Sequence, residues 1–356
     1  MIPHRKYMEM ALKLAEKGRG TASPNPLVGS IVVKRGKIIG RGYHKIAGED
    51  HAEVIALKQA GKRAKLATLY VSLEPCSYWG RTPPCTDAIM KSGVFEVIIG
   101  MKDPNPNVEG FIILKSSGIR TRIGVLEEEA RKQNEVYVKY TKTKKPFVYL
   151  KVATSLDGKI ATSTGKSKYI TSKDSRKHVH QLRNEVDAIL IGINTLLKDN
   201  PQLDSRLVKG KEPIKIVVDS SLKIPVNAKI MRVPEKVIIA TTKKAQKAKI
   251  KQLQQKGARV IILNSKQGFV NLNDLMKELG KHEITSLLVE GGNKLNSSAL
   301  KEKIVDKILI FTAPRLIGKG LDAFGDLGIR NLDKTINLKN ISTKNIGKDI
   351  LVEGYL

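Results

Sequence analysis

Hydrophobic and polar positions along the first half of the chain predict helices and strands in alternation. Residues 8–17 carry apolar side chains at helical spacing, and Gly18 and Gly20 end that segment. Two runs rich in β-branched residues surround Arg35-Gly36 and predict a hairpin over residues 30–44. The pattern then predicts helices over 51–64, 85–93 and 127–145, and strands over 68–75 and 95–106.

The second half repeats this alternation, beginning with a predicted strand over residues 147–160. Between helix-like stretches, further short apolar runs predict strands at 188–193, 214–219, 236–242, 259–263, 286–292 and 307–314. Strands that alternate with helices indicate an α/β fold in both halves. At 356 residues the chain is long enough for two domains, and a charged connector suggests a boundary between residues 145 and 146. We therefore expect domains over 1–145 and 146–356.

Net charge is the most unusual bulk property of the chain. With 64 Lys and Arg against 34 Asp and Glu, the formal charge is +30. Such a charge suits a polyanion or a phosphate-bearing small substrate, but it also suits a solvated Lys-rich surface. Because the basic residues are mostly Lys spread along the chain, and aromatic residues make up only 4%, we favour the solvated surface over a nucleic-acid partner.

The chain contains two cysteines, and its N-terminus does not resemble a secretion signal. Apolar runs do not reach the ~18 residues that a membrane-spanning helix needs, so we expect no membrane partner. These features predict a cytoplasmic protein, in which two thiols more often bind metal than form a disulfide.

One group of four residues has the composition of a catalytic zinc site: His51, Glu53, Cys76 and Cys85. One His and two Cys supply three ligands and leave the fourth position of the metal for water. Glu53, as a non-ligand, could pass a proton from water to a leaving amine, which is the arrangement of zinc-dependent base deaminases. Because residues two apart on a regular helix do not share a face, His51 must lie at the first turn. The alternative is an ordinary histidine with two buried, inert cysteines.

A second candidate site follows the predicted strand at 286–290, where Gly291-Gly292 opens a helix-like stretch. Free backbone N–H groups at a helix start, together with the helix dipole, favour a phosphate group. An ordinary turn would have the same appearance.

Longer motifs give the chain a family resemblance. In the first half these are PNPLVGSIVV (24–33), HAEVIAL (51–57), LEPCSYWGRTPPCTDAI (73–89) and DPNP (103–106). In the second half they are residues 151–161, 165–171, 192–206 and 289–292. Together they closely resemble the bifunctional deaminase–reductase of riboflavin biosynthesis. The resemblance implies a cytidine-deaminase-like N-terminal domain with Zn²⁺ and a dihydrofolate-reductase-like C-terminal domain with NADPH. The substrate would be a diaminohydroxypyrimidine bearing a phosphoribosylamino group, which is deaminated and then reduced from ribosyl to ribityl.

The resemblance also assigns residues of the first half to substrate binding. Asn25 and Gly29 would line the base pocket, and Asp103 and Asn105 would help to hold the substrate. Asn25, Asp103 and Asn105 also lie next to prolines, and each could serve only to form a turn.

In the second half the resemblance assigns two sets of contacts. Those to the cofactor would come from Ala153, Tyr169, Thr195, Asp199, Gly292, Asn293, Lys294, Leu295, Asn296, Ser297 and Ser298. Those to the substrate would come from Ser167, Arg183, Leu203, Arg206 and Glu290. Arg183 and Arg206 can grip a phosphate with paired N–H groups, although either could be a surface arginine. Lys151 or Asp199 would assist protonation of the opened sugar; the alternative for Lys151 is a strand residue with a solvated head.

Two other functions compete with this interpretation. The positive charge would suit a tRNA base deaminase with a C-terminal RNA-binding module, which would bind RNA in a salt-sensitive manner. A decayed deaminase kept as a scaffold would not need Glu53 beside three intact ligands. The family resemblance further implies a homo-oligomer, either a dimer or a tetramer.

Overall fold

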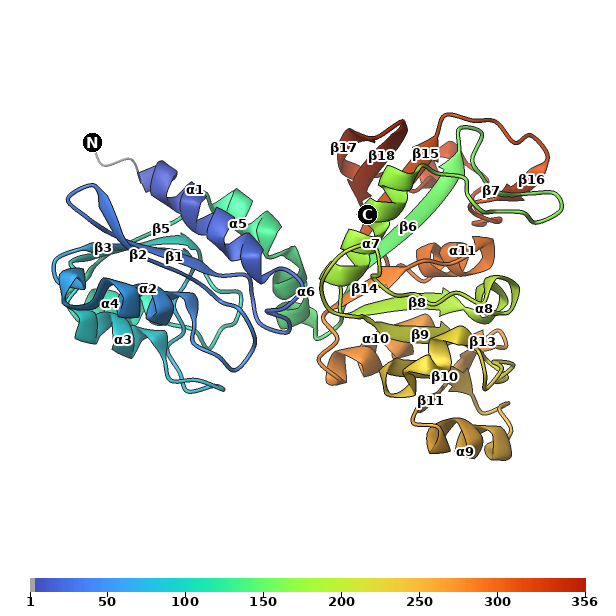
Figure 1. Ribbon diagram of the computed structural model, residues 1–356, viewed down its shortest axis with the longest axis horizontal. Helices are drawn as coiled ribbons and strands as arrows, with labels where there is room; N and C mark the ends of the chain where they lie inside the picture. The colour runs from blue at the N-terminus through green and yellow to red at the C-terminus, as the bar shows by residue number, and fades with distance from the viewer. Residues whose placement is uncertain (1–3) are drawn as a thin grey trace. The chain divides into compact units, whose positions relative to one another are not determined.

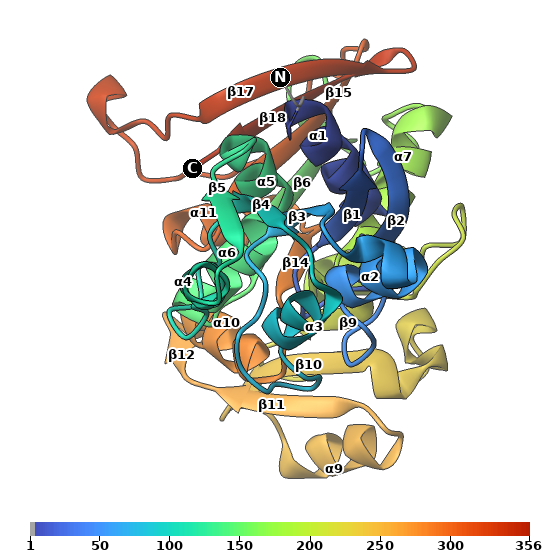
Figure 2. The same ribbon diagram turned by 90° about the vertical axis from the view of Figure 1, so that its left-hand side faces the viewer.

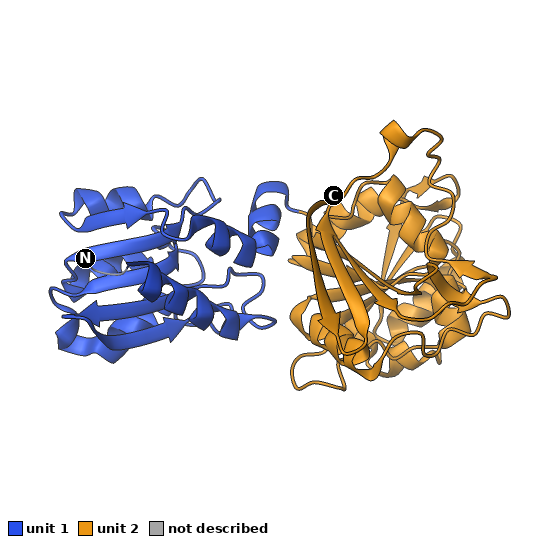
Figure 3. Ribbon diagram, turned by 90° about the horizontal axis from the view of Figure 1, so that it is seen from above, with its two compact units in different colours: residues 1–144 blue, residues 145–356 orange. Residues whose placement is uncertain are grey.

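The computed structural model describes residues 4–356 and divides into two compact units, residues 1–144 and 145–356 (Figure 3). The sequence-based boundary after residue 145 lies next to this division. Among the described residues, no helix is both long enough and apolar enough to cross a membrane.

The first unit is a five-stranded sheet between helices, with strand order β2-β1-β3-β4-β5 (Figure 1). Its strands are β1 (Gly29–Lys34), β2 (Lys37–Tyr43), β3 (Thr68–Leu73), β4 (Glu96–Met101) and β5 (Arg120–Ile123). Its helices are α1 (His4–Ala15), α2 (Ala52–Ala60), α3 (Cys85–Ser92), α4 (Gly110–Ser116), α5 (Glu127–Gln133) and α6 (Glu135–Thr143). The predicted hairpin is confirmed as β1 and β2, and Arg35 and Gly36 both have positive φ angles at its turn.

Strand directions bring several loops of the first unit to one edge of its sheet. β3 pairs parallel with β4 and antiparallel with β1, so the ends of β3 and β4 lie beside the start of β1. The end of β2 joins them, because Tyr43 pairs with Gly29. The segments around residues 25, 44, 76 and 103 therefore meet at this edge.

Each face of this sheet is covered by its own apolar cluster. α1 packs on one face with Ile31, Tyr70 and Ile98. α2, α3 and α4 cover the other face through a cluster that includes Val71 and Ile99 (Figure 1).

The structure corrects one expectation for the first unit and adds two elements. The helix predicted over 127–145 is divided into α5 and α6 at Asn134, whose φ of −101° is not helical. No element was predicted over residues 108–123, which contain α4 and β5. Both segments are short, so their hydrophobic pattern is weak.

The second unit is built on a nine-stranded sheet of order β11-β10-β9-β8-β14-β6-β15-β18-β17. Its strands are β6 (Phe147–Ser155), β8 (Ala188–Gly192), β9 (Ile214–Val218), β10 (Val237–Thr242), β11 (Arg259–Leu263), β14 (Ser286–Val289), β15 (Lys307–Ala313), β17 (Lys339–Ile346) and β18 (Asp349–Tyr355). Short strand pairs lie beside it: β7 (Lys159–Thr162) with β16 (Gly320–Asp322), and β12 (Ser265–Lys266) with β13 (Phe269–Val270). Its helices are α7 (Lys173–Glu185), α8 (Ile193–Asp199), α9 (Lys247–Gln255), α10 (Leu272–Lys281) and α11 (Asn293–Lys301).

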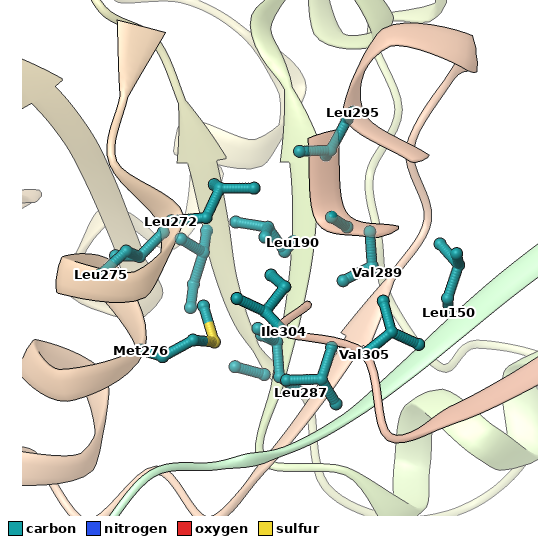
Figure 4. Close-up of a cluster of buried hydrophobic side chains, with 14 of the residues drawn as sticks. Leu150, Leu190, Leu272, Leu275, Met276, Leu287, Val289, Leu295, Ile304 and Val305 are labelled. Atoms are coloured by element: carbon teal, nitrogen blue, oxygen red, sulfur yellow. The ribbon is translucent and has the colours of Figure 1, made fainter. Parts of the chain in front are cut away.

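All strand pairs from β11 to β15 in this order are parallel, whereas β18 and β17 extend the sheet antiparallel (Figure 2). Helices cover both faces, as expected for buried parallel strands. α10 and α11 contribute Leu275, Met276 and Leu295 to the cluster on one face (Figure 4). α8 and α9 contribute Leu196 and Leu253 to the cluster on the other.

The predicted strands of the second half are confirmed with one correction. Residues 147–160 form two strands, β6 and β7, because the chain turns at residues 156–158, where Gly158 has a φ of 77°. The sequence did not predict β17 and β18.

Candidate functional site: a metal-ligating cluster and a buried charge cluster

The four residues of the predicted zinc site converge at the sheet edge where the loops of the first unit meet. His51 is the N-cap of α2 and Cys85 is the first residue of α3, so both stand where a loop becomes a helix. Cys76 follows the end of β3. Because His51 precedes the helix rather than lying within it, Glu53 in the first turn can approach the same point.

The three ligand-type side chains already have the spacing of a metal site. His51 Nδ1 lies 3.1 Å from Cys85 Sγ and 3.5 Å from Cys76 Sγ. Within residues 4–356, this is the group of His, Cys, Asp and Glu side chains whose donor atoms lie close enough to share an ion, all within 4.8 Å of one another. Tetrahedral zinc with ordinary bond lengths places such N and S atoms about 3.6 Å apart. The donor set and its spacing therefore fit zinc.

Neighbouring groups orient these donors. Thr82 Oγ1 lies 3.2 Å from His51 Nε2, which leaves Nδ1 to face the two sulfur atoms. The backbone N–H of Cys85 donates to Cys76 Sγ over 3.2 Å. Hydrogen bonds from Cys85 and, against the cost of burial, from His51 lower the pKa of the Cys76 thiol to about 4. Glu53 is 3% exposed, and burial raises the pKa of its carboxyl to about 7.

The predicted substrate residues of the first unit lie around this cluster, with partners that the sequence did not reveal. Asn25 Nδ2 lies 3.0 Å from Nε2 of the buried His44, whose ring meets that of His51 edge-on with centroids 5.0 Å apart. Asn105 Nδ2 donates to the exposed Tyr78 hydroxyl over 3.0 Å. No role was predicted for His44, nor for Tyr78 and Thr82, although the last two lie within the 73–89 motif.

Gly29 and Asp103 have clear packing roles. A Cβ atom on Gly29 would lie 2.0 Å from the carbonyl oxygen of Ala11, so glycine allows α1 to rest on β1. The Asp103 carboxylate accepts hydrogen bonds from the backbone of Asn105 and from the Tyr137 hydroxyl. Burial raises the pKa of Asp103 to about 6.

A buried charge cluster occupies the centre of the second unit. Glu290, just after β14, accepts from Lys151 Nζ at 2.9 Å and from Arg183 Nε at 2.6 Å and Nη2 at 3.0 Å. The exposed fraction of the side chain is 7% for Glu290, 15% for Lys151 and 14% for Arg183. Although burial opposes ionisation, Arg183 and Lys151 hold the pKa of the Glu290 carboxyl well below its ordinary value.

This cluster changes two expectations. The head of Lys151 is not solvated, because it is paired with Glu290. Arg183 directs its paired N–H groups at Glu290 and a third nitrogen at the Asp204 carbonyl, 3.1 Å away, so in this structure they do not face a free phosphate site. Arg206 differs: 58% of its side chain is exposed, and its guanidinium donates to the nearby Asp204 and Gln202.

Four further residues were predicted for the substrate, the cofactor or catalysis in the second unit: Leu203, Ser167, Ala153 and Asp199. Leu203 is buried and has a positive φ of 53°. Ser167 is partly exposed in the segment between β7 and α7. Ala153 lies on β6 two residues beyond Lys151, so both point to the same face of the sheet. Asp199 is the last residue of α8 and is partly exposed.

The predicted phosphate turn is confirmed as a turn that opens a helix, with Gly292 as the N-cap of α11. A Cβ atom on Gly292 would lie 3.5 Å from Thr195 Oγ1, so the starts of α8 and α11 lie side by side. Leu295, Asn296 and Ser297 are buried, while Asn293, Lys294 and Ser298 are more accessible. A cofactor at this turn would therefore meet backbone N–H groups rather than these three buried side chains.

Tyr169, another predicted cofactor contact, has 64% of its surface exposed. The guanidinium of Arg176 lies 4.2 Å from the centroid of its ring, and Arg315 donates to its carbonyl oxygen over 3.2 Å. A flat ring backed by a cation on one side and open on the other suits stacking against a planar ligand. The sequence did not indicate Arg176 or Arg315.

Comparison with known proteins explains why these two sites occur in one chain. Residues 1–101 match the family model of the cytidine and deoxycytidylate deaminase zinc-binding region, and residues 146–352 match that of the RibD C-terminal domain. The chain is 47% identical to the riboflavin biosynthesis protein RibD of Aquifex aeolicus over 98% of its length and 97% of that protein. It belongs to the RibD family.

Solved structures agree over both units. The Acinetobacter baumannii RibD superposes with a TM-score of 0.90 at 34% identity, covering 99% of this chain and 98% of that one. A Thermotoga maritima protein described as a diaminohydroxyphosphoribosylaminopyrimidine deaminase/5-amino-6-(5-phosphoribosylamino)uracil reductase gives a TM-score of 0.87 at 37% identity, with the same coverage.

Membership of the family establishes the general function. The chain is a bifunctional enzyme of riboflavin biosynthesis, with a zinc-dependent deaminase unit and an NADPH-dependent reductase unit. The alternative of a tRNA deaminase is not supported, because the second unit matches a reductase domain instead of an RNA-binding module.

Proposed function

We propose that the two units act in sequence on a diaminohydroxypyrimidine that carries a phosphoribosylamino group. The first unit replaces one ring amine with oxygen from water, and the second reduces the ribosyl group of the product to ribityl with NADPH. The observation that carries this proposal is the preformed cluster of His51, Cys76 and Cys85, with Glu53 buried beside it. The activity described for the Thermotoga maritima relative supports the substrate.

In the deaminase unit we assign His51, Cys76 and Cys85 as zinc ligands. Zinc bound there would supply a Lewis acid that makes water nucleophilic near neutral pH. Glu53 takes a proton from that water and returns it to the leaving amine, which departs as ammonia. Asn25, positioned by His44, and Asn105, positioned by Tyr78, bind the pyrimidine at the rim of the site.

In the reductase unit we assign binding of the pyrimidine and the opened sugar to the region around Lys151, Arg183 and Glu290. Opening of the sugar leaves a C=N bond at its first carbon; hydride would add to that carbon and Lys151 would supply the proton to the nitrogen, with Asp199 as the other candidate donor. Arg206, with its exposed guanidinium, binds the phosphate together with Ser167. The turn before α11, Thr195 and Tyr169 bind NADPH, and the cofactor itself carries the hydride.

A product assay by mass spectrometry tests the order of the two reactions. Purified enzyme is given the pyrimidine substrate with and without NADPH. We expect exchange of an amine for oxygen without NADPH, followed by the gain of two hydrogens when it is added. Cys85→Ser should lose zinc and deamination but still reduce the deaminated product. Reduction of the undeaminated substrate, or full zinc content in Cys85→Ser, would contradict the assignment.

We further propose that the enzyme is cytoplasmic and homo-oligomeric. Cys76 and Cys85 are free thiols, as a reducing compartment would keep them. The edge strand β17 exposes Ile341 at 60% and its neighbour β18 exposes Ile350 at 45%, which suits contact with a second copy. Light scattering of the purified chain would show a dimer or tetramer, and a monomer at micromolar concentration would contradict this part of the proposal.

A further inference from the structure

The break between α5 and α6 holds two loops of the deaminase site at once. Asn134 stands at the break, 2% exposed, and lies outside the 1–101 region that matches the zinc-binding deaminase model. Its Oδ1 accepts from the backbone N–H of Leu27 over 2.8 Å, and its Nδ2 donates to the Leu27 carbonyl over 3.0 Å. One side chain thus pairs with both backbone groups of a residue 107 positions away.

Leu27 belongs to the loop that carries Asn25 to the rim of the site. This loop runs from residue 22 to the start of β1. On either side of Leu27 its backbone is held by the Asn25 N–H, which donates to the Ala22 carbonyl, and by the His44 N–H, which donates to the Val28 carbonyl. The two hydrogen bonds from Asn134 therefore fix its backbone just after Asn25, while His44 holds the Asn25 side chain.

Tyr137 lies three residues after Asn134, on the first turn of α6, and holds the second loop. Its hydroxyl donates to the Asp103 carboxylate, 3.1 and 3.2 Å from the two oxygens. Asp103 in turn accepts from the Asn105 backbone over 2.8 Å, and its own N–H donates to Glu74 at the end of β3. The position of Asn105 therefore depends on a carboxylate that Tyr137 anchors.

We propose that Asn134 and Tyr137 are positioning residues of the deaminase site, which hold the loops bearing Asn25 and Asn105 at the spacing that the pyrimidine requires. Neither side chain contacts the ligand-type cluster in the described structure, so they act on substrate binding and not on the metal. The role of these loops in binding rests on the proposed function. The hydrogen bonds of Asn134 and Tyr137 are independent of that function.

The geometry explains why polar residues occupy these two positions. Asp103 is only 9% exposed, and without the Tyr137 hydroxyl one of its oxygens would lose its protein donor. A buried charged group without a partner costs free energy, and the loop can relieve that cost only by moving toward water. Such a movement would displace Asn105.

The test uses two variants of the full chain, Tyr137→Phe and Asn134→Ala, with Tyr70→Phe as a matched control. Tyr70→Phe also removes a hydroxyl that has a partner, because the Tyr70 hydroxyl lies 3.0 Å from His4 Nδ1. Tyr70 itself packs with α1 on the opposite face of the sheet. For each protein, KM and kcat of deamination, zinc content and reduction of the deaminated product are measured.

We expect KM for deamination to rise about tenfold in Tyr137→Phe and at least as much in Asn134→Ala. The value of kcat should change less than twofold, and zinc content and reductase rate should stay at the wild-type level. Tyr70→Phe should leave KM unchanged. Unchanged KM in both variants, or an equal rise in Tyr70→Phe, would overturn the proposal.

Amide hydrogen exchange separates this inference from the proposed function, because it needs no substrate. Tyr137→Phe should speed exchange at residues 103–108 and Asn134→Ala at residues 23–28, each leaving the other loop protected. If the wild-type enzyme does not deaminate the pyrimidine, the proposed function fails while the exchange pattern still supports the positioning role. Wild-type exchange at both loops in the variants would overturn that role whatever the substrate is.

Discussion

The two sites of this chain are built in opposite ways. The deaminase cluster takes its donors from residues 51–85, at the start of two helices and the end of one strand. The reductase cluster joins Lys151 on β6, Arg183 on α7 and Glu290 after β14, which are distant in sequence and meet only through the parallel sheet. The first therefore leaves a compact motif. The family resemblance names the three residues of the second, but their ion pairs are seen only in the folded chain.

Their dependence on charge differs as well. The three ligand-type side chains gather around a position that a cation fills, and their unit has its own apolar cores. The charge of Glu290 is instead balanced by Lys151 and Arg183, and these ion pairs help to stabilise the second unit. We infer that damage to the first site abolishes chemistry and leaves stability, and that damage to the second affects both.

The largest expected effect comes from Glu53→Gln, which keeps the shape of the side chain but removes its ability to accept a proton. Deamination should fall about 10²- to 10⁴-fold in kcat, the usual contribution of a positioned general acid–base. Zinc content, melting temperature and reductase rate should not change. Steady-state kinetics, metal analysis and thermal denaturation together measure these four quantities.

Glu49→Gln is the matched control, because Glu49 is exposed four residues earlier on the same segment. Its deamination rate should equal that of the wild type. If Glu53→Gln retained wild-type kcat, the proton-transfer role would be wrong. If it lost zinc as well, the separation between chemistry and stability drawn above would fail.

The second prediction concerns Glu290→Gln, which leaves Lys151 and Arg183 buried without their counter-charge. Breaking one partner of a buried ion cluster costs about 3–5 kcal/mol, so the second unit should unfold at a markedly lower denaturant concentration. Reductase activity should be lost, while deamination continues. Unfolding of the variant and the wild type is measured by denaturant titration, and the deaminase and reductase activities are assayed separately without denaturant.

Glu278→Gln gives the surface counterpart in the same unit. Glu278 pairs with Lys281 over 2.9 Å, but 71% of that lysine side chain is exposed. Exposed ion pairs contribute about 0–1 kcal/mol, so this variant should unfold as the wild type does. Equal stability loss in the two variants would contradict the contrast between buried and exposed pairs.

The same contrast explains how much could be predicted from the sequence. Short apolar runs gave the alternating strands and helices, and the α/β class of both units is confirmed. His51, Glu53, Cys76 and Cys85 could be grouped because few other roles need those residue types together. The break at Asn134 could not be predicted, since its cause is a pair of bonds to Leu27 in a distant loop.

Two other misses have similar physical causes. β17 is exposed on both faces, so its residues show no alternation of apolar and polar positions. Lys151 was predicted as a candidate proton donor, but its ion pair with Glu290 was not, because the two residues are distant in sequence. Pairings between distant residues are therefore what the sequence did not reveal.

The smallest expected effect is that of Arg206→Ala, which separates the exposed arginine of the reductase site from the buried one. The exposed guanidinium of Arg206 donates to the nearby Asp204 and Gln202, so its removal should leave the melting temperature unchanged. Losing one charged hydrogen bond to the substrate phosphate should raise KM for reduction about tenfold, and added salt should narrow the difference. Arg259→Ala, on the exposed edge strand β11, is the control and should leave KM unchanged. A fall in melting temperature with unchanged KM would instead make Arg206 a structural residue, and the phosphate would then need another partner.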